Sequence, residues 1–110
     1  MRWVSSECWV LLINFQSLSK ATPFRASHAI YVRENARTAA VFENRLPDML
    51  AERTLGLRGF TGDGYLHDGS LAAPGEAHEG IGRLLRQSEV AYVDIHAAGY
   101  GCFIARAERN

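Results

Sequence analysis

The chain has 110 residues, of which 47% are hydrophobic, and this length and composition predict one domain, 1–110, with one modest core. Its 12 basic and 12 acidic residues cancel to a formal net charge of zero. This balance gives no electrostatic reason to expect nucleic acid or a membrane surface as a partner.

The cysteines and the N-terminal segment indicate the compartment. Cys8 and Cys102 form neither a CxxC pair nor a zinc-binding spacing, and a disulfide between them stays open. The apolar run CWVLLI (8–13) has no small-residue cleavage site after it and is too short to cross a bilayer. We therefore expect a cytoplasmic protein with free thiols.

The first half of the chain predicts two strands and a short helix. The segment CWVLLINF (8–15) is short, apolar and rich in β-formers, and HAIYVRE (28–34) alternates as a strand does. NARTAAVFENR (35–45) is ambiguous. LPDMLAERTL (46–55) predicts a short helix, because a proline fits its first turn and an apolar stripe follows, made of Leu46, Met49 and Leu50.

The second half predicts a hairpin, a helix and two further strands. The segment 55–71 contains the turn dipeptide Asp63-Gly64, and 72–87 carries apolar residues at helical spacing, namely Ile81, Leu84 and Leu85. EVAYVDIHA (89–97) and CFIARAER (102–109) are expected to be strands. The order of these elements predicts an α+β fold with a mostly antiparallel sheet and two helices packed against it.

Three blocks of the chain resemble a known family. The stretches RASHAIYVRE (25–34), LPDMLAERTLGLRGFTGDGYLHDGSL (46–71) and AYVDIHAAGYGCFIARAER (91–109) together are similar to the bacterial family catalogued as domain of unknown function 1203. The resemblance covers about residues 9–109 and implies no assigned activity. Members of that family usually begin with a further N-terminal segment, so the resemblance also implies that this chain lacks it.

A nucleophilic site is one hypothesis for the C-terminal part. A thiolate at Cys102 would need a neighbouring imidazole, which His96 could supply across a hairpin, with Asp94 orienting the imidazole from the same strand face. The alternative for Cys102 is a small buried hydrophobe beside a tight turn. The alternative for Asp94 and His96 is a solvated strand face.

An anion-binding site is the second hypothesis. Arginines on or beside predicted strands could converge with histidines on one anionic small molecule, and the expected lining is Arg25, His28, Arg58, His96 and Arg106. Alternatively, the arginines make ordinary surface pairs with Asp63, Asp94 or Glu108, each worth about 0–1 kcal/mol.

The histidines show no metal-binding spacing. His28, His67, His78 and His96 form no HxH, HxxxH or HExxH arrangement, so we expect no metal site and no cofactor. His67 and His78 are expected to face solvent. The sequence thus supports two functional hypotheses, a binding domain for an anionic small molecule and an enzyme with a cysteine nucleophile, and it leaves the oligomeric state open.

Overall fold

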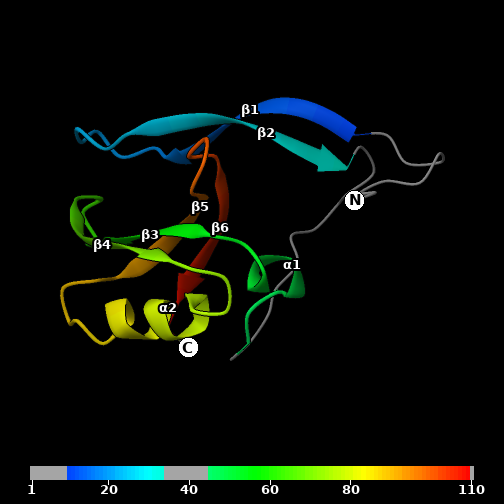
Figure 1. Cartoon of the computed structure of the whole chain (residues 1–110). Coiled ribbons are helices and arrows are strands. Elements are labelled where there is room, and N and C mark those ends of the chain that lie inside the picture. The colour runs from blue at the N-terminus through cyan, green and yellow to red at the C-terminus, as the bar shows by residue number, and fades with distance from the viewer. Residues whose placement is uncertain (1–9, 34–44, 110) are drawn as a thin grey trace.

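The computed structural model describes residues 10–33 and 45–109, and the side chains of 14–27, 45–47 and 50–109. The chain runs through strands and helices in the expected order, as Figure 1 shows: β1 (Val10–Leu18), β2 (Ala26–Arg33), α1 (Asp48–Ala51), β3 (Leu55–Phe60), β4 (Leu66–Ala72), α2 (Ala77–Leu85), β5 (Tyr92–Ala97) and β6 (Phe103–Glu108). All but the last residue of the ambiguous segment 35–45 lies outside the described residues.

The strands form two separate antiparallel sheets. β3 to β6 make a four-stranded sheet in the order β4-β3-β5-β6, while β1 and β2 pair only with each other. Figure 1 shows this β1–β2 hairpin across one face of the larger sheet and α2 across the opposite face. The predicted α+β class with an antiparallel sheet is confirmed, but the first of the two helices is only a four-residue turn. It ends early because Leu55, four residues on, already enters β3 and the core.

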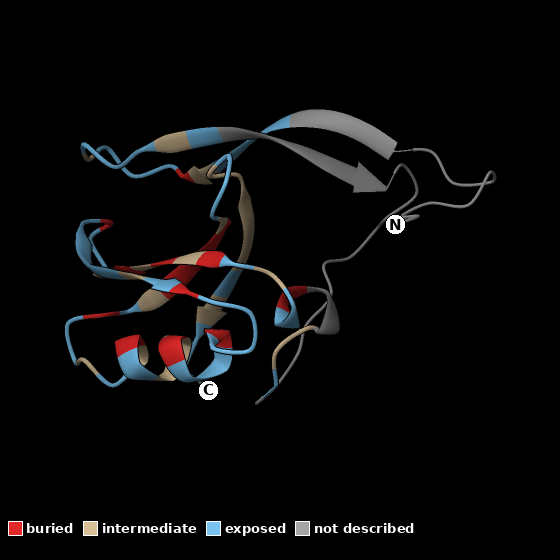
Figure 2. Ribbon diagram, in the orientation of Figure 1, coloured by how far each residue is buried: buried red, intermediate tan, exposed pale blue. Residues whose placement is uncertain are grey.

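The hydrophobic core lies between the four-stranded sheet and α2, where Figure 2 places most of the buried residues. Successive strand side chains point to opposite faces, so Leu55 and Leu57 of β3 and Ile95 of β5 point toward the helix. The predicted helical stripe faces them: Leu84 is buried, and Ile81 and Leu85 pack against the cluster. The burial of each such side chain stabilises the fold by about 1.5–3 kcal/mol.

The alternate side chains of the sheet point toward the hairpin. Phe15 of β1 stacks on Phe103 of β6, with ring centroids 5.3 Å apart. At the tip of the hairpin, Thr22 Oγ1 donates a hydrogen bond to the Gly64 carbonyl (3.0 Å), and Lys20 Nζ donates one to the Gly62 carbonyl. The hairpin therefore contacts this face at β6 and at the turn between β3 and β4, and its Phe24 ring also lies edge-on to Phe60 of β3, with centroids 6.3 Å apart. In the described ranges, no helix is long and apolar enough to cross a membrane.

Candidate functional site

Three charged residues form a row across the hairpin-side face of the sheet. In the register of the strands, Arg58 of β3 lies opposite Asp94 of β5, and Asp94 lies opposite Arg106 of β6. Directly opposite residues in antiparallel strands share a face and have neighbouring Cβ atoms. Because the hairpin lies over this part of the sheet, Asp94 is only 1% exposed.

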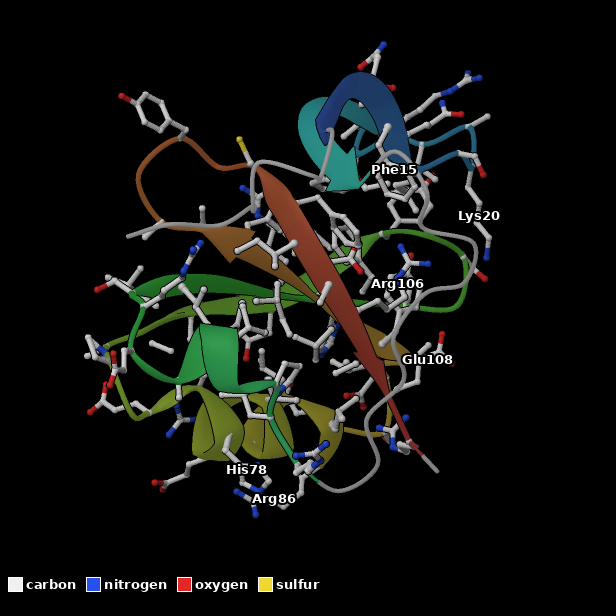
Figure 3. The ribbon with its side chains drawn as sticks, turned by 90° about the vertical axis from the view of Figure 1, so that its right-hand side faces the viewer. Phe15, Lys20, His78, Arg86, Arg106 and Glu108 are labelled. Atoms are coloured by element: carbon white, nitrogen blue, oxygen red, sulfur yellow. The ribbon has the colours of Figure 1, made fainter. Side chains whose placement is uncertain are left out.

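Arg106 neutralises the buried carboxylate of Asp94. Its Nε donates to Oδ1 (2.7 Å) and its Nη2 to Oδ2 (3.1 Å), a two-pronged contact that occupies both oxygens. Nη2 also donates to the Ser17 carbonyl of β1 (2.7 Å), and the guanidinium lies 4.2 Å from the centroid of the Tyr92 ring. The hydrogen bonds to Asp94 raise the pKa of Arg106, which keeps it charged. Figure 3 shows Arg106 beside β6 and below the hairpin residue Phe15, while α2 lies at the bottom of the view.

Arg58 occupies the third position of the row and is half-buried. Within the described part of the chain, its guanidinium has no hydrogen-bond or ion-pair partner. Asp94 lies directly opposite Arg58, but the hydrogen bonds that its oxygens accept from described side chains come from Arg106. The row thus holds two positive charges and one negative charge, which leaves one positive charge without a counter-charge.

Two glycines flank Arg58 on the same face. Gly69 of the edge strand β4 lies directly opposite Arg58, and Gly56 lies two residues before it in β3. Among the described residues, a Cβ atom on Gly56 would have two neighbours within 4 Å, the His96 carbonyl oxygen at 3.8 Å and the His96 Cβ at 3.9 Å. A Cβ atom on Gly69 would have one described neighbour, the Leu57 carbonyl oxygen at 3.3 Å. No side chain of the described hairpin residues comes within 4 Å of these two Cβ positions, and Gly69 is exposed.

His96 is held by the turn that follows it. The imidazole is 2% exposed, and its Nδ1 lies 2.8 Å from the Gly101 carbonyl oxygen. A carbonyl oxygen only accepts hydrogen bonds, so Nδ1 carries a proton. The ring also contacts Phe103 edge-on, with centroids 5.7 Å apart. Asp94 shares this face, as expected, but its carboxylate is bound to Arg106.

Cys102 is a free, half-buried cysteine at the start of β6. It follows the turn residue Gly101, whose φ is +76°. Among the described side chains, none makes a hydrogen bond to its thiol, and the described hydrogen bond of the His96 ring goes to the Gly101 carbonyl. Cys102, His96 and Asp94 are thus neighbours in the β5–β6 hairpin without forming the chain of hydrogen bonds that activates a nucleophile.

The remaining expected ligand residues lie elsewhere. Arg25 is exposed at the tip of the β1–β2 hairpin, and the side chain of His28 lies outside the described set. His67 and His78 are exposed, and His67 Nε2 lies 3.3 Å from Glu89 Oε2. The residues whose side chains are described include no group of three or more His, Cys, Asp or Glu that could hold a metal.

Two expectations from the sequence need correction. The alternative that Asp94 and His96 occupy a solvated face is wrong, because the β1–β2 hairpin lies over them and leaves them 1% and 2% exposed. The pairing of a strand arginine with Asp94 is present, but on a buried carboxylate and not at the surface. Sequence reasoning also missed Gly56 and Gly69. A glycine inside a strand often marks a close approach to the backbone, and this pattern could have identified both.

The fold and these residues define a small α+β domain with a charged row partly covered by a β-hairpin. The chain belongs to the family described as protein of unknown function (DUF1203), whose family model matches residues 1–109. Searches of the curated proteins and of the solved structures give no match.

Proposed function

We propose that this protein is a small binding domain that holds an anionic small molecule at Arg58. The observation that carries the proposal is the half-buried Arg58 guanidinium, which lacks a described partner although Asp94 lies directly opposite. A guanidinium that is partly removed from water is stabilised by an anion, because hydrogen bonds to charged groups contribute about 1.5–3 kcal/mol. An incoming anion would supply that contact.

The other residues of the row support Arg58. Arg106 neutralises the charge of Asp94 through two hydrogen bonds, which weakens the competition of Asp94 with the ligand for Arg58. Arg106 is therefore a positioning residue, and Arg58 is the contact residue. Arg25 lies at the hairpin tip, and neither it nor His28 is needed for this contact.

This function is favoured over a cysteine-dependent enzyme by the contacts of the two groups. Cys102 has no hydrogen-bonded base among the described side chains, whereas Arg58 has an unmatched charge. The free thiol of Cys102 is the state expected in a reducing compartment, and we accordingly place the domain in the cytoplasm.

The proposal is tested by NMR titration of the arginine Nε–Hε signals with acetate and with inorganic phosphate. We expect a saturable shift of the Arg58 signal, with a dissociation constant on the order of millimolar, since one charge-assisted contact carries the binding. Arg58→Gln should abolish saturable binding, while Arg86→Gln, at an exposed position just after α2, should leave it unchanged. Equal binding by the wild type and Arg58→Gln would overturn the proposal.

A further inference from the structure

The surroundings of Arg58 indicate more about the ligand than its charge. We propose that the molecule bound there is a monocarboxylate with a flat apolar body, of the aromatic carboxylate class. The carboxylate would bind Arg58, and the apolar body would lie on the backbone at Gly56 and Gly69, against Leu71. This inference rests on the proposed function and narrows it to one class of ligand.

The charge of the row favours a single negative charge on the ligand. Two arginines and one aspartate leave one positive charge unmatched, and a carboxylate neutralises it. A phosphate dianion would add a second negative charge close to Asp94, a buried carboxylate with 1% exposure, where like charges repel strongly. The planar guanidinium fork also matches the two oxygens of a carboxylate.

The two glycines provide the flat surface beside this charge. Gly56 and Gly69 place no side chain over the backbone of β3 and β4 on the side where Arg58 lies, and no described hairpin side chain comes within 4 Å of their Cβ positions. β3 is paired on both of its edges, to β4 and to β5, so its peptide groups already have hydrogen-bond partners. An apolar ring can therefore lie on the β3 part of this surface without depriving a backbone N–H or C=O of water, and the Gly69 N–H of the edge strand β4 already donates a hydrogen bond to Asp68 Oδ1 (2.8 Å).

Leu71 extends the same surface with an apolar side chain. It lies directly opposite Gly56, on the face that carries Arg58, and 69% of it is exposed. A ring seated over Gly56 and Gly69 would contact Leu71 and remove part of it from water. An arginine, uncovered backbone and an exposed leucine side by side fit a ligand that is charged at one end and apolar at the other.

The test compares four probes by NMR titration: benzoate, acetate, inorganic phosphate and benzyl alcohol. We expect benzoate to bind about tenfold more tightly than acetate, because the ring adds apolar contact. Phosphate should bind more weakly than benzoate. Benzyl alcohol should not bind measurably, because it lacks the charge.

Variants separate the inference from the function on which it rests. Gly56→Val fills the surface with a side chain that strands favour. The variant should still bind acetate, and it should bind benzoate about as tightly as acetate. Leu71→Ser, at an exposed position, should lower benzoate affinity alone and serves if Gly56→Val does not fold. Leu66→Ser, at the other end of β4, is its matched control and should change nothing.

The outcomes are distinguishable. Equal affinity for benzoate and acetate, tighter binding of phosphate, or an unchanged benzoate preference in both Gly56→Val and Leu71→Ser would overturn the inference and leave anion binding at Arg58 standing. If no anion binds, or if Arg58→Gln binds all of them as the wild type does, the proposed function itself fails.

Discussion

Replacing Arg106 with methionine should destabilise the protein strongly. The substitution keeps much of the length of the side chain but removes both hydrogen bonds to Asp94, at 2.7 and 3.1 Å, and the one to the Ser17 carbonyl at 2.7 Å. Asp94 would then be an ionised carboxylate, 1% exposed, without its partner. The hairpin would also lose its hydrogen bond to β6.

The expected loss is about 3 kcal/mol in the free energy of unfolding at neutral pH. Removing one partner of a buried ion pair costs about 3–5 kcal/mol, because the other charge stays buried. The lower end applies here, since 34% of the Arg106 side chain is exposed and water screens the pair there. Arg58 lies opposite Asp94 and should compensate in part, so Arg58→Gln should cost about 1 kcal/mol more in the Arg106→Met background than in the wild type.

Urea unfolding followed by circular dichroism measures these differences. Asp94→Asn should recover part of the loss in the Arg106→Met background, because a neutral amide replaces the unpaired charge. Arg86→Met is the control and should change stability by less than about 0.5 kcal/mol. A loss below about 1 kcal/mol for Arg106→Met would refute the view that this pair is buried and tightly coupled.

Three further predictions concern α2, β4 and the thiol. Gly82→Ala should stabilise the protein by about 0.5–1 kcal/mol, because a Cβ there meets nothing within 4 Å, whereas Gly80→Ala should destabilise it by about 1 kcal/mol, because its Cβ would lie 2.7 Å from the buried Leu57 Cδ1. Thermal unfolding decides between them, and a stabilising Gly80→Ala would contradict the close packing of α2 on β3. The hydrogen bond from Gln87, followed by the one from the Gly69 N–H, lowers the pKa of Asp68 below its ordinary value of 3.8. The ionised Asp68 carboxylate therefore stabilises the folded protein above pH 3.8. This stabilisation is lost as the pH falls through the lower pKa that Asp68 has in the folded protein. Gln87→Ala should raise the pKa of Asp68 in an NMR titration, and an unchanged value would disprove the assignment. Because Cys102 is only half-buried, it should be alkylated in the folded protein in a Cys8→Ser background. Protection until global unfolding, seen by mass spectrometry, would show that it is a core residue.

The elements of the four-stranded sheet follow from local sequence. The alternation of Leu55 and Leu57 in β3 and the helical spacing of Ile81 and Leu84 in α2 match the faces that these elements bury. The periods of strand and helix are local properties of the backbone, so a single sequence carries them. For the same reason the turn at Asp63-Gly64 was predictable, and Gly64 adopts a φ of +88° there.

The candidate site is different, because its properties depend on segments far apart in the chain. The sequence identified Arg58, Asp94 and Arg106 as residues of interest, yet it did not determine which of the arginines binds Asp94. That choice depends on the register between β3, β5 and β6. The register also places Gly69 opposite Arg58, although the 10 residues 59–68 lie between them in the chain.

The sequence by itself determined the α+β class, the order of the elements and the apolar stripe of α2, since each follows from the residue pattern within a helix, a strand or a turn. Only the tertiary structure decided that the face carrying Asp94 and His96 is buried. The cause is the β1–β2 hairpin, which contacts that face through Phe15 on Phe103 and Ser17 on Arg106. Burial is what makes the charge balance of the row matter, because it removes the water that would otherwise screen Asp94, while Arg58 has no ion-pair partner among the described residues.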